Sequence, residues 1–484
     1  MDKYVVLDGN MSEKLNIVSL DKIESDNGYM SAIKADNQAF FSANGYRRSV
    51  YVLTLGCQQN ESDSEKLLGM AESMGYVVTD KPDDAYLIIV NTCAIREHAE
   101  KRALSLVGQF KHIKVKRPEL IIAVCGCMVV QKHRADALKN SYPYVDIVFG
   151  TSSIHRFPEY LCEKLKRGRR VLRSDQPEYT VAEDVPIRRE STYRAWVSVM
   201  YGCNNFCTYC IVPYVRGRER SRHKEKIIEE VRMLVAEGYK DITLLGQNVN
   251  SYGKDLGAEY DFADLVAELD TIEGDYMLHF MTSHPKDATR KLIDVMATGK
   301  HIAHHFHLPM QSGSDRVLAV MNRRYTFDKY IGIVDYIREK MPDATITSDI
   351  IVGFPNESEE DFEATLTALR RARFDMIFSF IYSPRKGTPA YDMEQVADEV
   401  KSERFERLLN TQNDISYDSN KSFEGRTVRV LCDGRSKNKA EAINGRTEGG
   451  KIVFFDGDET MTGQFVNVEI QRAETFALHG KIVK

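Results

Sequence analysis

The chain has 484 residues, of which 43% are hydrophobic and 28% are charged, and its formal net charge is −5. These proportions are typical of a globular protein with about two to four domains and exclude a general polyanion binder, so a nucleic-acid site must be a local patch. The longest apolar run, 120–130, is broken by Gly126 and is too short to span a bilayer, and the first residues show no secretory apolar core. We therefore expect a cytoplasmic protein with no membrane partner, whose nine cysteines are ligands or free thiols rather than disulfides.

The first third of the chain predicts an α/β domain behind a short extension. Residues 1–47 contain few apolar residues and no sustained period, which favours a flexible or loosely packed extension with room for a short helix. Over residues 48–165, apolar runs at 50–55, 85–90 and 120–124 alternate with helix-like stretches. This pattern predicts an open parallel sheet with helices on both faces.

Each of these three runs is followed closely by a cysteine: Cys57, Cys93 and Cys127. Open α/β sheets bind ligands beyond the carboxyl ends of their strands, so the fold itself would bring the three thiols together. The alternative is three separately buried thiols, which are common singly. Cys125 could replace Cys127 as the third member, but we favour Cys127 because it lies farther past the strand end.

A second set of cysteines follows a predicted linker over 166–192. The apolar run 195–200 ends at a loop with Cys203, Cys207 and Cys210 in a Cys-x3-Cys-x2-Cys spacing. Three thiolates on one loop can hold three irons of a cubane cluster and leave the fourth iron open. The alternatives are buried thiols or a zinc site completed by a histidine, although zinc sites favour Cys-x2-Cys pairs and a second pair is missing.

The remaining sequence predicts a partial barrel and then a small all-β domain. Strand candidates at 241–245, 277–281, 303–308, 345–352 and 377–382 join the run before Cys203 to make six βα units over 193–420, short of the eight units of a closed barrel. This predicts a (β/α)6 barrel that is open on one side. Residues 421–484 contain five short strand candidates, one of them at 439–443, and predict a small barrel of a kind that commonly binds RNA.

Four arginines follow the second cysteine loop at alternate positions: Arg216, Arg218, Arg220 and Arg222. On an extended segment they would share one face and follow a phosphate backbone. The alternative is a surface strand held by salt bridges.

Several of these motifs resemble a known family. Gly56-Cys57-Gln58 with Asn60, Asn91-Thr92-Cys93 with Arg96, and Gly126-Cys127 are similar to the N-terminal domain of the methylthiotransferases. The Cys203 loop resembles that of the radical S-adenosylmethionine (SAM) enzymes, and the terminal barrel resembles a TRAM domain. The resemblance covers about residues 48–484, and the segment 244–253 is similar to the branch that acts on tRNA carrying dimethylallyladenosine.

The resemblance implies methylthiolation of carbon 2 of N6-dimethylallyladenosine next to the anticodon. One SAM would donate the methyl group and a second would supply a radical, which can break an unactivated aromatic C–H bond that acid–base catalysis cannot. Two 4Fe-4S clusters are implied, one held by Cys203, Cys207 and Cys210. The other would be held by Cys57, Cys93 and Cys127.

Four further residues resemble positions that contact SAM in the superfamily: Tyr209, Gln247, Gln311 and Asp349. A fifth candidate, Arg385, follows the sixth strand candidate and could face the SAM carboxylate or a phosphate. The expected partners are the tRNA anticodon stem-loop and a reducing protein such as flavodoxin or ferredoxin, and the expected working unit is a monomer. Two alternatives stay open at this point. One is the same chemistry on threonylcarbamoyladenosine tRNA or a ribosomal protein side chain, and the other is a non-catalytic iron–sulfur sensor that binds RNA.

Overall fold

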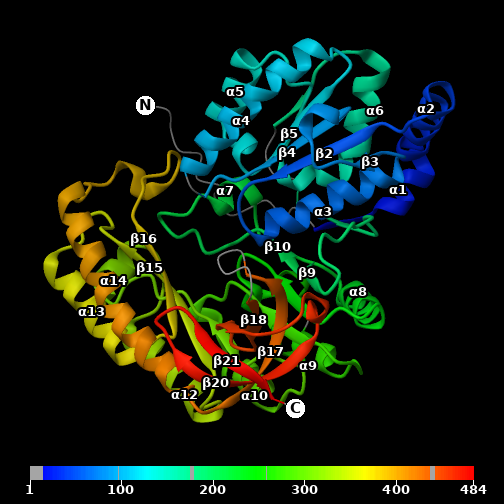
Figure 1. Cartoon of the computed structure of the whole chain (residues 1–484). Helices are drawn as coiled ribbons and strands as arrows, with labels where there is room; N and C mark the ends of the chain where they lie inside the picture. Colours follow the sequence, from blue (N-terminus) through cyan, green and yellow to red (C-terminus); the bar gives the residue numbers. More distant parts are fainter. Residues whose placement is uncertain (1–14, 96, 175–178, 258, 437–441, 484) are drawn as a thin grey trace.

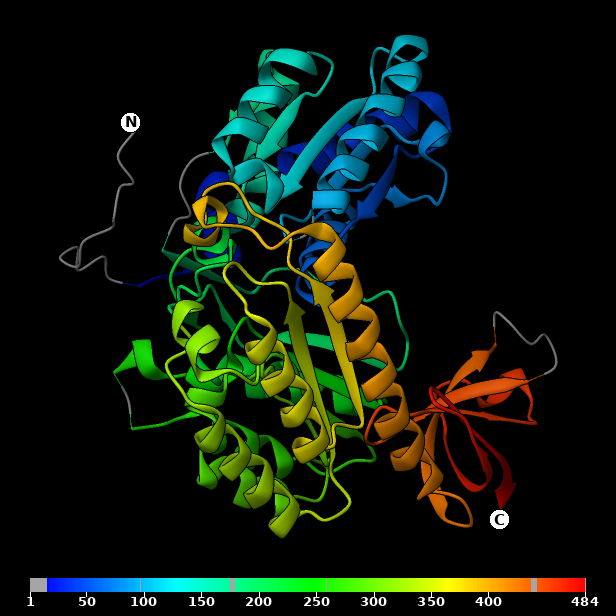
Figure 2. The same cartoon turned by 90° about the vertical axis from the view of Figure 1, so that its left-hand side faces the viewer.

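A computed structural model describes residues 15–483 apart from 96, 175–178, 258 and 437–441. An N-terminal α/β domain lies over one end of a central partial barrel, and a small β-barrel lies at the other end (Figures 1 and 2). This arrangement confirms the predicted fold class. No helix in the described part of the chain combines the length and apolar character needed to cross a membrane.

The N-terminal domain is built on a six-stranded sheet in which every pair of neighbours is parallel. The strand order is β3-β2-β4-β5-β6-β7, so the chain reverses direction across the sheet between β2 and β4. Helices cover both faces (Figure 1). The elements are β2 (Ser49–Thr54), α3 (Gln58–Ser73), β3 (Val77–Val78), β4 (Leu87–Thr92), α4 (Glu97–Lys116), β5 (Ile121–Gly126), α5 (Lys132–Ser141), β6 (Ile147–Phe149), α6 (Phe157–Arg167) and β7 (Val171–Arg173).

The expectation of a flexible extension over residues 1–47 is wrong for its described part, while residues 1–14 lie outside the described residues. The segment forms β1 (Asn16–Ser19), α1 (Leu20–Asn27) and α2 (Tyr29–Asn44), and α2 packs on α6. Leu20 and Ile33 are buried in the domain core, and the Asn37 side chain donates to the Met74 carbonyl at 2.8 Å. Only a few apolar side chains and one buried amide anchor this segment to the domain. The sequence therefore lacks the repeated apolar pattern from which a packed helix could have been predicted.

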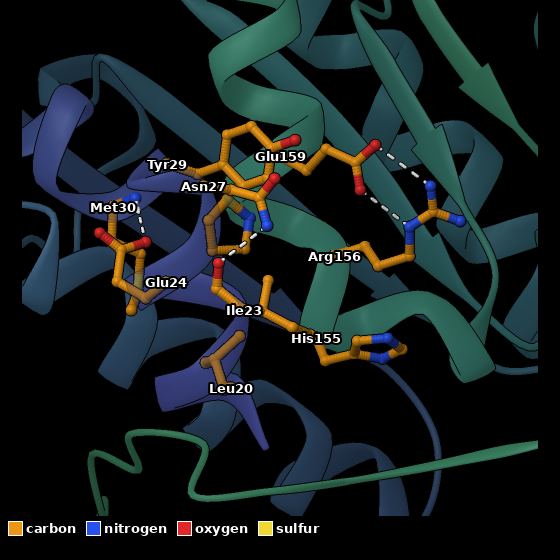
Figure 3. A pocket seen from close by; sticks show the side chains of 10 residues that line it. Leu20, Ile23, Glu24, Asn27, Tyr29, Met30, His155, Arg156 and Glu159 are labelled. Atoms are coloured by element: carbon orange, nitrogen blue, oxygen red, sulfur yellow. Dashed lines mark hydrogen bonds and ion pairs between the residues drawn. The ribbon is translucent and has the colours of Figure 1, made fainter. Parts of the chain in front are cut away.

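A pocket of about 370 Å³ lies between this segment and α6 (Figure 3). Its charged groups already have partners: Arg156 forms an ion pair with Glu159 at 2.9 Å, and the Glu24 carboxylate accepts from the Met30 backbone at 2.8 Å. The lining contains no cysteine. This pocket is therefore a packing feature of the docked segment and lies apart from the predicted chemistry.

The predicted linker over 166–192 is also largely packed into the fold, and its residues 175–178 lie outside the described residues. β7 is the edge strand of the N-terminal sheet, and β8 (Thr180–Glu183) pairs with β1. The next residues cross α3 closely, because a Cβ on Gly69 would lie 2.3 Å from the Pro186 carbonyl oxygen. The segment reads as a linker because its contacts are made by backbone and charged groups rather than by an apolar period.

The central domain contains six parallel strands in the predicted order. Two three-stranded sheets, β13-β12-β9 and β14-β15-β16, are joined by a parallel bridge between Leu278 and Ile302. The elements are β9 (Arg194–Ser198), β10 (Met200–Tyr201), α7 (Val212–Arg216), β11 (Arg220–Ser221), α8 (Lys224–Ala236), β12 (Asp241–Leu245), α9 (Phe262–Asp270), β13 (Met277–Phe280), α10 (Arg290–Thr298), β14 (His305–His307), α11 (Asp315–Val320), α12 (Phe327–Lys340), β15 (Thr345–Val352), α13 (Glu359–Ala372), β16 (Met376–Ile381) and α14 (Asp398–Lys421).

The C-terminal domain is a closed barrel in the order β17-β18-β19-β21-β20. Its strands are β17 (Thr427–Arg435), β18 (Ile443–Thr447), β19 (Ile452–Phe455), β20 (Phe465–Ala473) and β21 (Leu478–Val483), and most of the strand candidate at 439–443 lies outside the described residues. The barrel docks at the amino ends of the central strands. Asp433 pairs with Arg194 at the start of β9 at 2.9 Å, and the half-buried Lys451 pairs with Asp375 just before β16 at 2.8 Å.

Candidate functional site

The carboxyl ends of β2, β4 and β5 bring Cys57, Cys93 and Cys127 to one edge of the N-terminal sheet. Cys57 and Cys93 flank the point where the strand order reverses, which is where open α/β sheets bind ligands. Two glycines with positive φ allow the loops that carry these cysteines to approach one another closely. A Cβ on Gly56 (φ 133°) would lie 2.8 Å from the Cys93 Cβ, and a Cβ on Gly126 (φ 100°) would lie 2.3 Å from the Thr92 carbonyl oxygen.

Asn60 joins the loops that carry these cysteines. Its side-chain nitrogen donates to the Leu55 and Thr92 carbonyls at 3.1 and 2.9 Å, which ties the end of β2 to the end of β4. Its oxygen accepts from the Cys57 thiol at 3.5 Å and from Arg216 at 2.9 Å. The resemblance included Asn60 only as part of a motif, and the structure gives it this joining role.

The buried Arg216 lies beside the first cysteine set. It donates to Asp63 of α3 at 2.9 Å, and its electrostatic neighbours include Cys127 and Cys57. Burial acts to lower the pKa of Arg216, but Cys127 and Asp63 outweigh burial and raise it, so the guanidinium stays charged. A positive charge at this place favours thiolates over thiols.

The structure separates Cys127 from Cys125. Cys125 lies inside the hydrophobic core beneath the sheet, whereas Cys127 is an electrostatic neighbour of Cys93 and Cys57. Burial raises the pKa of Cys127 to about 12, so this thiol keeps its proton unless a metal takes the proton's place.

The second set, Cys203, Cys207 and Cys210, lies on the loop between β10 and α7, at the carboxyl end of β9. The three thiols lie together, because Cys207 and Cys203 both act on the pKa of Cys210. Burial is the largest cause that raises the pKa of Cys210, and it also raises the pKa of Cys203 to about 12. Cys203 and Cys210 therefore keep their protons unless a metal takes the protons' place.

The two sets of cysteines meet at α7. Ile211, directly after Cys210, and Val215 form one small apolar cluster with Ala94 and Cys127. The Val215 carbonyl also accepts from Thr151 of the N-terminal domain at 3.0 Å. The loop of one set therefore continues directly into the helix that packs on the other set.

The donors suit clusters better than a single metal ion. Among the described residues, no three His, Cys, Asp or Glu side chains converge closely enough to hold one metal ion. A cubane attaches each thiolate to a different iron, so its ligands stand farther apart than the ligands of one ion. Each set offers only sulfur donors, which is the ligand type of iron–sulfur clusters.

The five predicted SAM-contact residues all lie near the carboxyl rim of the partial barrel. Gln247 follows β12, and its Oε1 is buried without a hydrogen-bond donor in the described structure. Gln311 (φ 69°) bridges the end of β14 to β15, and Asp349 of β15 lies 3.6 Å from His307. The Tyr209 ring packs edge-on against Phe354, and Arg385 follows β16.

Three further polar residues join this rim: Asn250, His284 and Tyr382. Each has a buried side-chain atom without a partner in the described structure, namely Asn250 Nδ2, His284 Nε2 and the Tyr382 hydroxyl. Burial raises the pKa of Tyr382 to about 12 and, with Arg323, holds the pKa of His284 far below its usual value, so both side chains are neutral. In the sequence, their position after the strands β12, β13 and β16 could have indicated that they lie at the rim.

The prediction that four alternating arginines face RNA is wrong for three of them. Arg216, Arg220 and Arg222 are buried, and Arg222 pairs with Glu183 at 2.7 Å. Only Arg218 is exposed, with its guanidinium 4.5 Å from the centre of the Phe206 ring. The segment includes a helix and a two-residue strand rather than one continuous extended run, so alternate residues do not share a solvent face.

Comparison with known proteins follows the three structural parts. Residues 197–369 match the radical SAM superfamily, residues 49–150 match the uncharacterized protein family UPF0004, and residues 421–483 match the TRAM domain. The radical SAM methyltransferase TsrM from Kitasatospora setae, solved with cobalamin and a [4Fe-4S] cluster bound, has a TM-score of 0.53 at 15% identity. That likeness covers 71% of this chain and 77% of TsrM. It concerns the fold alone.

Two curated relatives match over nearly their whole length. The tRNA-2-methylthio-N(6)-dimethylallyladenosine synthase of Acetivibrio thermocellus is 47% identical over 477 residues, covering 98% of this chain and 99% of the relative. The synthase of the same name from Clostridium botulinum (strain Loch Maree / Type A3) is 49% identical over 432 residues, covering 89% of this chain and 96% of the relative. The chain therefore belongs to the family of radical SAM tRNA methylthiotransferases that contains these synthases.

Proposed function

We propose that this enzyme methylthiolates carbon 2 of N6-dimethylallyladenosine beside the anticodon of tRNA, with one SAM as methyl donor and a second SAM as radical source. The observation that carries the proposal is the meeting of two sulfur-only ligand sets through α7, where Ile211 and Val215 pack with Cys127. A reaction that moves both sulfur and a methyl group to an unactivated carbon needs two such centres close together.

We assign Cys203, Cys207 and Cys210 as ligands of one 4Fe-4S cluster and Cys57, Cys93 and Cys127 as ligands of a second. The bound clusters would supply one-electron chemistry and an open iron at each site. Residues around the two cysteine sets favour cluster binding. Cys93, Cys127, Cys203 and Cys207 are buried away from water. Asn60 orients Cys57, and Arg216 supplies positive charge beside Cys57 and Cys127.

The barrel rim would bind SAM. The unpaired Gln247 Oε1 suits an amino group, and the neutral Asn250, His284 and Tyr382 offer uncharged hydrogen-bonding groups in the same region. We include Tyr209, Gln311, Asp349 and Arg385 in this binding site. Tyr209 lies on the second cysteine loop, and its aromatic contact with Phe354 supports a wall of this binding site at that loop.

The TRAM domain supports RNA as the substrate class. Because this domain docks at the amino ends of the barrel strands, the tRNA that it binds must reach around the barrel to the rim. We propose the anticodon stem-loop as that part of the tRNA, a monomer as the working unit, and a small reducing protein such as flavodoxin or ferredoxin as the electron source.

The test is mass spectrometry of tRNA from a strain that lacks the gene, complemented with variants of the chain. Wild type should restore the 2-methylthio group on dimethylallyladenosine, and Cys57→Ala and Cys203→Ala should not. Cys432→Ala is the control, because Cys432 lies in the core of the terminal barrel. Restoration on threonylcarbamoyladenosine, or on a ribosomal protein alone, would overturn the assigned substrate.

A further inference from the structure

Arg323 lies beside the second cysteine loop and contacts one of its thiols. Its Nη1 is 3.4 Å from the Cys207 sulfur and 3.5 Å from the Tyr209 hydroxyl. Nε donates to the Tyr325 hydroxyl at 3.1 Å, and Nη2 donates to the Pro309 carbonyl at 2.9 Å. The side chain is buried, so water does not screen its charge.

Arg323 has no carboxylate among its hydrogen-bond acceptors in the described part of the chain. The acceptors are one thiol, two phenols and one carbonyl. Arg216 beside the first cysteine set differs, because Asp63 already balances its charge. A buried guanidinium without an anion is unfavourable, so the surroundings of Arg323 suit an anion at the position of Cys207.

The backbone around Arg323 fixes this contact. Both neighbours, Asn322 (φ 60°) and Arg324 (φ 61°), adopt the left-handed conformation that non-glycine residues rarely take. Asn322 donates to the Asn205 and Phe206 carbonyls at 3.2 and 3.0 Å. The Thr208 hydroxyl donates to the Val320 carbonyl at 2.9 Å. The turn 320–324 therefore holds the loop 205–208 while it aims Arg323 at Cys207.

We propose that Arg323 is a positioning residue that raises the reduction potential of the iron–sulfur cluster held by Cys203, Cys207 and Cys210. The inference rests on the ligand assignment proposed above. Reduction adds one electron to a cluster and therefore one negative charge. A hydrogen bond from an N–H group to a ligand sulfur, together with a nearby positive charge, stabilises the reduced cluster more than the oxidised cluster.

The experiment measures the potential of this one cluster in the full chain. A Cys57→Ala, Cys93→Ala, Cys127→Ala background removes the other cluster, and an anaerobic redox titration follows the paramagnetic reduced cluster that remains. At the potential where the reference protein is half reduced, Arg323→Gln should lower the ratio of reduced to oxidised cluster about tenfold, which equals about 59 mV for one electron.

Two matched variants separate charge from folding. Arg323→Lys keeps the charge, and Arg324→Gln removes an exposed arginine from the same turn. Both should keep the ratio within about twofold of the reference. An unchanged ratio in Arg323→Gln with full iron content would overturn the inference and leave the ligand assignment intact.

Changes in iron content are also decisive. Loss of iron in Arg323→Gln together with its retention in Arg323→Lys would overturn the inference in favour of a charge that is needed to hold the cluster. Loss of iron in both would overturn it in favour of a packing role. A reference protein that binds no iron at this loop would overturn the ligand assignment and the inference together.

Discussion

Arg216 donates a hydrogen bond to Asp63 at 2.9 Å, and both side chains are buried where the N-terminal domain meets the barrel. The pair joins α7, which follows the Cys203–Cys210 loop, to α3, which follows Cys57. It therefore fixes the relative position of the two cysteine sets as well as the charge beside one of them.

Removal of one member of this pair should destabilise the protein strongly. Arg216→Met leaves the Asp63 carboxylate buried and uncompensated, and we expect the free energy of unfolding in urea to fall by about 3–5 kcal/mol. Glu119→Gln is the control, because Glu119 and Arg117 form an exposed pair that should contribute at most about 1 kcal/mol. Equal effects of the two substitutions would contradict the proposed role of the Arg216–Asp63 pair.

Gln247 should contribute to SAM affinity. Gln247→Ala removes the acceptor that we assign to the SAM amino group, and the loss of one hydrogen bond of about 0.5–1.5 kcal/mol should raise the dissociation constant about 2- to 12-fold. Equilibrium binding of SAM to the reconstituted protein measures this change. Gln464→Ala, on the exposed surface of the TRAM domain, should leave SAM affinity unchanged. Affinity equal to wild type in Gln247→Ala would remove Gln247 from the site.

Arg218 and Arg220 should affect tRNA binding differently. Arg218 is exposed near the Cys203 loop, so Arg218→Gln should reduce the slope of log affinity against log salt by about 0.7–0.9 for one lost phosphate contact. Arg220 is buried, and Arg220→Gln should lower thermal stability and leave that slope unchanged. Binding titrations over a range of salt concentrations measure both slopes. A reduced slope in Arg220→Gln alone would contradict this prediction, because it would mean that Arg220 contacts the phosphate backbone and Arg218 does not.

The docked N-terminal segment should stabilise its domain. Ile33 of α2 is buried, and Ile33→Ala should lower the free energy of unfolding of the N-terminal domain by about 2–5 kcal/mol through lost burial and a cavity. The control Lys34→Ala changes an exposed residue of the same helix and should stay within about 0.5 kcal/mol of wild type. Hydrogen exchange at the α2 amides measures both. Indistinguishable exchange in the two variants would mean that α2 does not depend on this contact.

The sequence predicted the positions of candidate site residues correctly where these residues follow successive strands of the fold. Cysteines after apolar runs predicted the edge where Cys57, Cys93 and Cys127 meet, because a parallel sheet aligns its carboxyl ends. The same logic predicted the six barrel strands and the rim position of Gln247.

The failures have a common physical origin in tertiary contacts that leave little periodic pattern in the sequence. The docking of α2 depends on Ile33 and on the Asn37 amide, which leave little periodic signal. The burial of Arg216, Arg220 and Arg222 depends on partners far away in the sequence, such as Asp63 and Glu183. The contact of Arg323 with Cys207 spans more than a hundred residues and could not be read from spacing.

The central claim is that the chain holds two iron–sulfur clusters, one for each cysteine set. Iron and sulfide counting after anaerobic reconstitution tests it most directly. We predict about eight irons per wild-type chain and about four per Cys57→Ala chain, because each cubane contains four. About four irons in the wild type, or the same count in both proteins, would contradict the account.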